Sequence, residues 1–202
     1  PVDMKMVTNS VIAWGVSQVA PHGVYLNREI NKIPYPPDWF TCNPYWRYLH
    51  LWTDFARRAS YINAHGYVVP DVLLLNPMDS MWGIVGGDIL DFNVSQRRRS
   101  SQVTGHGETV DQINEIYSKA ITNLSAARID YLVADRYYLR QMNISPDGLL
   151  VRKNFKFKAV ILPKMVILPL DVAEKVVAFA EAGGYVYLLG DLPEGSTDNG
   201  LK

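Results

Sequence analysis

The chain has 202 residues, of which 48% are hydrophobic, and its 20 Lys and Arg balance its 20 Asp and Glu. That composition allows a buried core in one or two domains, while zero formal net charge gives no indication of a nucleic-acid partner or an acidic membrane surface. The single cysteine, Cys42, excludes an intrachain disulfide and a metal site of the Cys/His type, and the sequence shows neither a signal peptide nor a run approaching the roughly 20 apolar residues of a membrane span.

The first third of the chain is expected to hold two helices separated by a long loop. Apolar Met4, Val7, Val11 and Trp14 recur at helical spacing and predict a helix over residues 4–19. Residues 18–26 are interpreted as a short strand, and the proline-rich residues 27–44 as an ordered extended loop. Residues 45–64 carry the strongest helical stripe, made by Tyr45, Tyr48, Leu49, Trp52, Phe55, Ala56, Ala59 and Ile62.

From residue 68 onward, strands and helices alternate. Residues 68–75 read as a strand buried on both faces, as in a parallel sheet. The turn-rich residues 76–105 are expected to be a lid-like loop or an insertion. Then follow a helix at 106–128, a strand at 129–134, a helix at 135–142, strands at 148–151 and 159–162 paired around Lys153-Asn154, a helix at 170–182 and a strand at 185–189.

This order predicts an α/β domain with a mainly parallel, doubly wound sheet of flavodoxin-like or amidotransferase-like type. The pattern before it, helix, strand, long loop and helix, fits the last βα unit of a (β/α)8 barrel. We therefore expect a barrel end at residues 1–66 and an α/β domain, itself truncated, at residues 67–202. Because the chain starts at Pro1 and stops soon after a strand, we also expect it to be a piece of a longer protein.

Candidate sites follow from where each strand ends. Ligands of open α/β sheets and of βα barrels sit beyond the carboxyl ends of the strands. That rule selects residues 22–46 in the first part, and residues 76–82, 135–136, 163–164 and 190–191 in the second.

The first of these segments combines carboxylates, hydrogen-bonding groups and aromatic faces, which is the mixture that binds sugars. Glu29 and Asp38 are its two acidic residues, and a glycosidase needs two carboxylates flanking the scissile bond. The alternative for each residue alone is a surface or packing role. As a whole the segment is interpreted as ligand-facing, through His22, Asn27, Arg28, Glu29, Asp38, Trp39 and Trp46.

The second part lacks the signature of a catalytic amidotransferase. No G-x-C-x-G or G-x-S-x-G occurs, and Cys42 lies before the sheet begins, so it is read as a packed thiol. The glycines at 83, 86 and 87 do not form a dinucleotide motif, and Arg97-Arg98-Arg99 is read as a solvated loop. His106 and Glu108 are read as the polar start of a helix.

Several short motifs, in this order, resemble one family. They are His22-Gly23, the proline-rich aromatic loop, an aromatic helix with Ala56-Arg57, and D-V-L-L-L-N-P at 71–77. This part is similar to the end of the catalytic barrel in glycoside hydrolases of the α-L-rhamnosidase type, family 106. The later pieces I-D-Y-L-V-A-D, G-L-L-V, K-A-V-I-L-P and F-A-E-A-G-G-Y-V resemble the amidotransferase-like domain, akin to the β-galactosidase trimerisation domain, that follows such a barrel.

The resemblance implies hydrolysis of a terminal sugar of a plant or bacterial polysaccharide by a carboxylate pair that lies mostly upstream of Pro1. It gives Glu29 as a guess for a catalytic residue, with His22, Asn27, Trp39 and Trp46 as substrate-binding residues. It implies a non-catalytic α/β domain, through which a homo-oligomer could form, and a periplasmic or extracellular location in a bacterium. No cofactor is expected, except that the family is linked to calcium. The rival interpretations are a structural or oligomerisation domain and a small-molecule-binding α/β domain.

Overall fold

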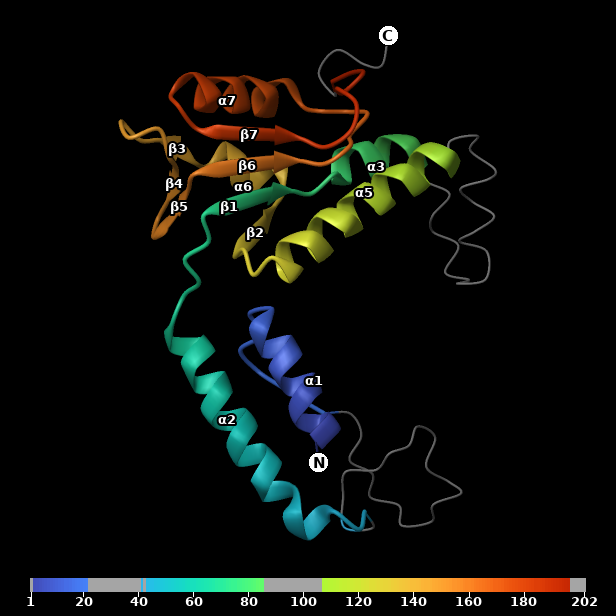
Figure 1. Ribbon diagram of the computed structural model, residues 1–202, viewed down its shortest axis with the longest axis vertical. Coiled ribbons are helices and arrows are strands. Elements are labelled where there is room, and N and C mark those ends of the chain that lie inside the picture. Colours follow the sequence, from blue (N-terminus) through green and yellow to red (C-terminus); the bar gives the residue numbers. More distant parts are fainter. Residues whose placement is uncertain (1, 22–40, 42, 86–106, 197–202) are drawn as a thin grey trace. The chain divides into compact units, whose positions relative to one another are not determined.

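The computed structural model describes residues 2–21, 41, 43–85 and 107–196 (Figure 1). The chain divides into two compact units, Pro1–Val68 and Val69–Lys202, which we describe separately. The second unit is α/β, with a parallel four-stranded sheet and a small antiparallel sheet.

The first unit is a helical pair, α1 (Val2–Ala13) and α2 (Leu49–His65), with a short 3-10 helix, η2 (Trp46–Tyr48), leading into α2. Polar contacts join the two helices. The indole Nε1 of Trp52 donates to the Thr8 hydroxyl at 2.9 Å, and Asn63 Nδ2 donates to the Ile12 carbonyl at 2.7 Å. Thr8 is fully enclosed and donates in turn to the Met4 carbonyl, so it is satisfied both as donor and as acceptor.

Two expectations for this unit are wrong in detail. The helix ends at Ala13, and the face predicted for it is only partly covered: Met4 and Val11 are half-buried, whereas Val7 is 64% exposed and Trp14, beyond the helix, is 80% exposed. Thr8 occupies the contact with α2 instead, because its hydroxyl meets the Trp52 indole. Residues 18–21 form no strand, and residues 22–26 of that expected strand lie outside the described residues.

The four-stranded sheet has the order β2-β1-β6-β7, and all its neighbouring strands are parallel. Its strands are β1 (Val72–Leu75), β2 (Tyr131–Ala134), β6 (Ala159–Leu162) and β7 (Tyr185–Leu188). The chain leaves β1 toward β2 on one side and leaves β6 toward β7 on the other. The gap between the carboxyl ends of β1 and β6 is therefore the topological switch point, where open α/β sheets bind ligands.

Both faces of this sheet carry helices, as a doubly wound sheet requires. On one face, α5 (Gly107–Ala126) packs Ala120 and Leu124 against Leu74 of β1. The other face carries the larger core, in which Leu73, Leu75, Val160 and Leu162 meet α6 (Arg136–Arg140), α7 (Leu170–Glu181) and the small sheet. That side holds most of the fully buried side chains, among them Phe157 and Phe179.

The expected pairing of residues 148–151 with 159–162 is wrong. The small sheet instead has the order β3-β4-β5, from β3 (Asn143–Ile144), β4 (Leu150–Arg152) and β5 (Phe155–Phe157). The turn at Lys153-Asn154 exists, with Lys153 at a φ of 52°, but it joins β4 to β5. Only after Lys158 does the chain enter β6, which pairs with β1 and β7.

The segment after β1 begins with a helix, α3 (Met78–Val85), where a loop was expected. Its side chains Met81 and Ile84 pack with Val110 and Ile113 of α5, so α3 belongs to the folded unit. The expected strand over 68–75 is shorter and starts at Val72, after Pro70. A short strand or helical turn expected at 89–94 lies outside the described residues.

Candidate functional site

Four of the five substrate-site candidates, His22, Asn27, Glu29 and Trp39, lie outside the described residues, as do Arg28 and Asp38. Trp46 is described. It opens η2, and its side chain is 43% exposed, so it is not a core residue. The sugar-site hypothesis for residues 22–46 therefore stays a prediction.

The other selected segments come together along one edge of the sheet. Because β1, β2, β6 and β7 are parallel, the residues that follow them all lie at its carboxyl edge. Each pair of neighbouring strands is joined there by one side-chain bridge. We call these three bridges the carboxyl-edge ties: Asp79–Arg136, Ser80 with Val166 and Ile167, and Lys164–Asp191.

The first tie joins the ends of β1 and β2. Arg136 Nη1 lies 3.0 Å from Asp79 Oδ1, and the two side chains are only 21% and 15% exposed. The Arg136 guanidinium lies over the Tyr137 ring at 4.7 Å, and its buried Nε has no hydrogen-bond partner among the described residues. One turn later, Arg140 pairs with Asp171 of α7. The helix α6 is thus held by arginines to α3 at one end and to α7 at the other.

Burial is the largest influence on the pKa of Asp79, the acidic residue of the first tie. Desolvation raises the pKa of Asp79 above its ordinary value of 3.8, although the charges of Arg136 and then Arg140 act in the opposite direction. The pKa of Asp171, which is more exposed, is lowered because Arg140 donates a hydrogen bond to its carboxylate. Two carboxylates near one helix therefore have their pKa values moved apart by their surroundings.

Asp79 should make the stability of the protein depend on pH with a defined sign. Its folded pKa is raised, so its favourable contribution to the free energy of unfolding is complete below 3.8 and is lost as pH rises through the folded pKa. We expect the stability of the wild type relative to Asp79→Asn to fall over that window and then to level. Urea unfolding of both proteins from about pH 3.5 to about pH 7 measures it. A relative stability that grows with pH would mean that Arg136 lowers this pKa instead.

The second tie lies at the switch point itself. The Ser80 hydroxyl is fully buried and donates to the Ile167 carbonyl at 2.9 Å. It also accepts from the backbone N–H groups of Val166 at 3.0 Å and Ile167 at 2.9 Å. Gly83 follows on α3, and a Cβ there would lie 2.3 Å from Ile167 Cδ1. The loops after β1 and β6 are therefore fastened together and closely packed where a ligand crevice would open.

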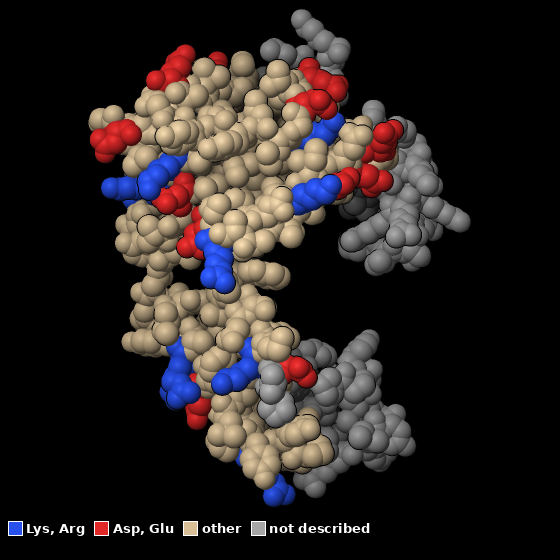
Figure 2. Space-filling view, viewed as in Figure 1, with Lys and Arg blue, Asp and Glu red and all other residues tan. Residues whose placement is uncertain are grey.

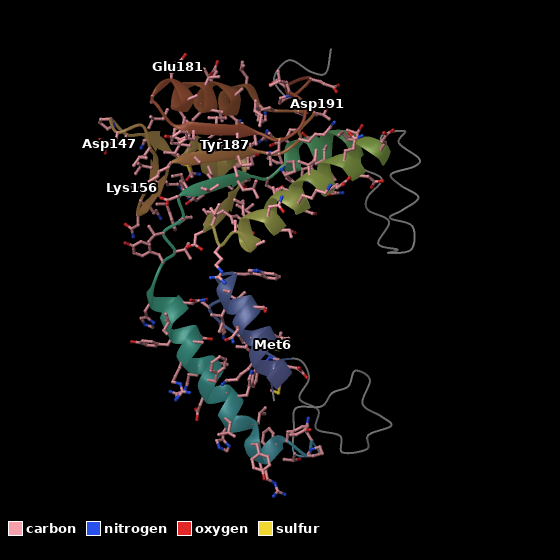
Figure 3. The ribbon with its side chains drawn as sticks, in the orientation of Figure 1. Met6, Asp147, Lys156, Glu181, Tyr187 and Asp191 are labelled. Carbon is pink, nitrogen blue, oxygen red and sulfur yellow. The ribbon has the colours of Figure 1, made fainter. Side chains whose placement is uncertain are left out.

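The third tie joins the ends of β6 and β7. Lys164 Nζ lies 2.8 Å from Asp191 Oδ2, with the lysine side chain 15% exposed and the aspartate side chain 85% exposed. Figure 3 labels Asp191. The pKa of Asp191 is lowered because Lys164 donates a hydrogen bond to it. Gly190 precedes Asp191 with a φ of 99°, and a Cβ there would lie 3.1 Å from Lys164 Cβ, so a glycine lets the chain pass this close.

The side chains of the carboxyl-edge ties bond to protein groups and do not form a catalytic arrangement. A serine nucleophile needs a free hydroxyl beside a general base, whereas Ser80 makes three backbone hydrogen bonds. The only histidine after residue 65 is His106, which is not described. Among the described residues no three His, Cys, Asp or Glu side chains group as metal ligands.

The rule that ligands lie beyond the carboxyl ends of strands selected these segments from the sequence. It did not predict the hydrogen bonds and ion pairs between them. Asp79, Ser80, Arg136, Lys164 and Asp191 all fall within the selected ranges. Arg140 and Asp171 were missed, since neither follows a strand and no sequence signal pairs a short helix with a later one.

Searches with family models, among curated proteins and among solved structures found no match to this chain. In the part of the chain that the structure describes, no helix combines the length and the apolarity that crossing a membrane demands.

Proposed function

We propose that this chain belongs to a glycoside hydrolase of the α-L-rhamnosidase type, with its sugar site in the segment around residues 22–46. In this proposal the first unit is the end of a (β/α)8 barrel, and the second is a non-catalytic α/β domain that supports it. The enzyme acts outside the cytoplasm on terminal sugars. The ordered series of short sequence motifs supports the family.

The observation that carries the non-catalytic role is the bonding of Ser80. The switch point is the place where an active α/β domain would present its nucleophile or bind its ligand. Here the one hydroxyl that α3 brings to that place bonds three backbone groups of the opposite loop. The flanking charges are also paired, as Asp79–Arg136 and Lys164–Asp191. This arrangement supports a scaffold rather than a reaction centre.

The same observation weighs against the small-molecule-binding alternative. A ligand of the flavodoxin type would need the loops after β1 and β6 to separate. Separation would leave the buried N–H of Ile167 and the partly buried N–H of Val166 without the Ser80 acceptor, at a cost of about 1–3 kcal/mol for an unpaired buried group.

The test is hydrolysis of a panel of aryl glycosides, including an aryl α-L-rhamnoside, by the protein expressed from its complete reading frame. We expect turnover of one member and a kcat lower by about 100-fold or more in Glu29→Gln, the range for losing a general acid or base. The melting temperature should not change. Absence of turnover with every glycoside would contradict the glycosidase assignment, and full activity of Glu29→Gln would remove Glu29 from it.

Two matched carboxylates serve as controls within the α/β unit. Asp191→Asn removes an exposed carboxylate at the carboxyl edge, and Glu181→Gln removes an exposed one on α7. Both should keep the wild-type kcat. A loss of kcat in Asp191→Asn alone, at unchanged stability, would contradict the non-catalytic role of this edge.

A further inference from the structure

The short helix α6 is fastened firmly at its C-terminal end. Lys175 Nζ of α7 donates to the carbonyl of Arg140 at 2.6 Å and to that of Met142 at 2.7 Å. The Arg140 guanidinium also pairs with Asp171 of α7. Met142 follows the helix and is fully buried in the main core. Polar links to α7 and a buried anchor therefore hold this end of the helix in place.

The first turn of α6, residues 135–137, is fastened more weakly. Among the described residues, its one polar link to another element is the pair of Arg136 with Asp79 of α3, at 3.0 Å. Tyr137 is 50% exposed, and its hydroxyl accepts from Arg136 of the same turn at 2.8 Å. The attachment of this turn to α3 thus depends on the first carboxyl-edge tie.

The residues on either side of this turn are fixed. Ala134 pairs with Leu75 in the sheet, and its carbonyl accepts from the Asn76 N–H at 2.8 Å. Leu139 is fully buried in the main core. Residues 135–137 therefore form a short strap between two anchored points, and the strap can move away from α3 while both anchors stay in place.

The charges under the strap differ in burial from most charges of the α/β unit. On the face that Figure 2 shows, charged side chains of this unit lie at its margins, around a centre of uncharged atoms. Asp79 and Arg136 are instead mostly enclosed, and the buried Nε of Arg136 has no hydrogen-bond partner among the described residues. Burying charged groups is unfavourable unless their partners compensate fully, so exposing this pair to water recovers part of that free energy.

We propose that residues 135–137 are a strap that opens and closes over Asp79, at the carboxyl edge between β1 and β2. In the closed form, which the structure shows, Arg136 covers the carboxylate of Asp79. In the open form the two side chains separate and both charges face water, while Ala134 and Leu139 stay in place. The strap belongs to the fold of the α/β unit and works in the same way whether or not the protein cleaves glycosides.

Opening has a defined signature in the backbone hydrogen bonds of α6. The Tyr138 N–H donates to the Asp135 carboxylate at 2.7 Å, and the Leu139 N–H donates to the Asp135 carbonyl at 3.1 Å. Both bonds break when Asp135 moves with the strap. The N–H groups of Gln141 and Met142 donate to the carbonyls of Tyr138 and Leu139, which stay in place, so these two amides keep their protection.

The strap should respond to pH through Asp79. The charges that face Asp79 are Arg136 and Arg140, which lower its pKa, and Asp135 and Asp171, which raise it. Desolvation in the closed form is the largest influence and raises the pKa of Asp79 above 3.8, whereas water removes that influence in the open form. Protonation of Asp79 therefore favours the closed strap, and opening increases as pH rises through the folded pKa.

The first test follows hydrogen exchange of single amides by mass spectrometry, in the wild-type protein expressed from its complete reading frame, from about pH 4 to about pH 7. After correction for the chemical pH dependence of exchange, the rates at Tyr138 and Leu139 should rise with pH and then level. The rates at Gln141 and Met142 should not rise. Equal protection of all four amides, or no response to pH, would mean that the strap does not open in this way and would overturn the proposal.

The second test changes the charge under the strap. Asp79→Asn keeps an oxygen acceptor for Arg136 but removes the enclosed negative charge. At about pH 7 it should therefore slow exchange at Tyr138 and Leu139 about fivefold and abolish their response to pH. Faster exchange at these two amides would mean that the charged pair holds the strap closed, and it would overturn the proposal.

Asp171→Asn makes the matched change at the other end of α6. The pKa of Asp171 is lowered because Arg140 donates a hydrogen bond to it, so this negative charge is favourable in the fold. Its removal should speed exchange at Gln141 and Met142 about fivefold. Circular dichroism verifies that each variant folds, and the pH series of the wild type stays decisive if Asp79→Asn misfolds. The same effect of both substitutions on all four amides would show that α6 moves as one body, which contradicts the strap.

Discussion

Gly184→Ala should lower the free energy of unfolding of the α/β unit by about 3 kcal/mol, the upper part of the usual range for overpacking a core. A Cβ at this position would lie 2.2 Å from both Cε2 and Cζ of Phe179. The ring has no room to retreat, since Phe179 is fully buried in the main core. The backbone cannot move away freely either, because the Gly184 N–H donates to the Phe179 carbonyl at 2.9 Å.

The neighbouring glycine provides the matched control. Gly183 has a φ of 98°, and no atom lies within 4 Å of the place that a Cβ would take there, so Gly183→Ala should cost only the backbone strain, about 1–2 kcal/mol. Chemical denaturation followed by circular dichroism compares the two variants. Phe179→Leu in the Gly184→Ala background should be less damaging than the sum of the single changes, because it makes room for the methyl group. Strict additivity would contradict the steric explanation.

Ser80→Ala should lower the free energy of unfolding by about 3 kcal/mol, because it leaves several backbone groups of the interior without a hydrogen-bond partner at once. The N–H groups of Val166 and Ile167 and the Ile167 carbonyl would each lose their bond to the hydroxyl. The loss should be measurable by urea unfolding and should appear as faster hydrogen exchange at those two amides.

Ser118, an exposed serine of α5, is the control for this substitution. Ser118→Ala makes the same chemical change on a helix surface, where alanine has the higher helix propensity, so stability should be unchanged or slightly higher. If Ser80→Ala were equally harmless, the tie between β1 and β6 would not contribute to stability. The structural argument for a scaffold role would then fail with it.

The parallel sheet was predictable because its strands are short apolar runs at regular intervals between amphipathic helices. The errors arise where a local pattern competes with a distant contact. The turn at Lys153-Asn154 suggests that residues 148–151 and 159–162 form a hairpin. In the structure β4 forms the hairpin with β5, and β6 pairs with β1, which is distant in the sequence. The exposure of Trp14 could not be predicted for the same reason. The contact of α1 with α2 uses the Thr8–Trp52 hydrogen bond, and a polar contact between distant residues does not appear in the spacing of apolar residues.

The candidate sites divide in a similar way. Parallel strands place all their carboxyl ends at one edge, so the rule that selected residues 76–82, 135–136, 163–164 and 190–191 needed only the strand positions. Whether those residues are free for a ligand depends on their bonds, such as that of Ser80 to Ile167, and a sequence pattern holds no information on them. The barrel-end interpretation and the sugar site at residues 22–46 stay predictions.

The order of the strands also bears on how the chain reaches its fold during synthesis. The strand β1 is synthesised first, yet Val72 pairs with Tyr131 of β2 on one side and with Ala159 of β6 on the other, and both of these are synthesised much later. By contrast, Ala159 of β6 meets Tyr185 of β7 after a single helix. Long-range pairing is slow because loop closure precedes any gain from contacts. The β6-α7-β7 unit is synthesised last, but once it has been made its two strands should pair faster than β1 pairs with β2 or β6. The apolar V-L-L-L of β1 should therefore stay unpaired on the nascent chain, and prone to aggregation, until β2 and β6 pair with it.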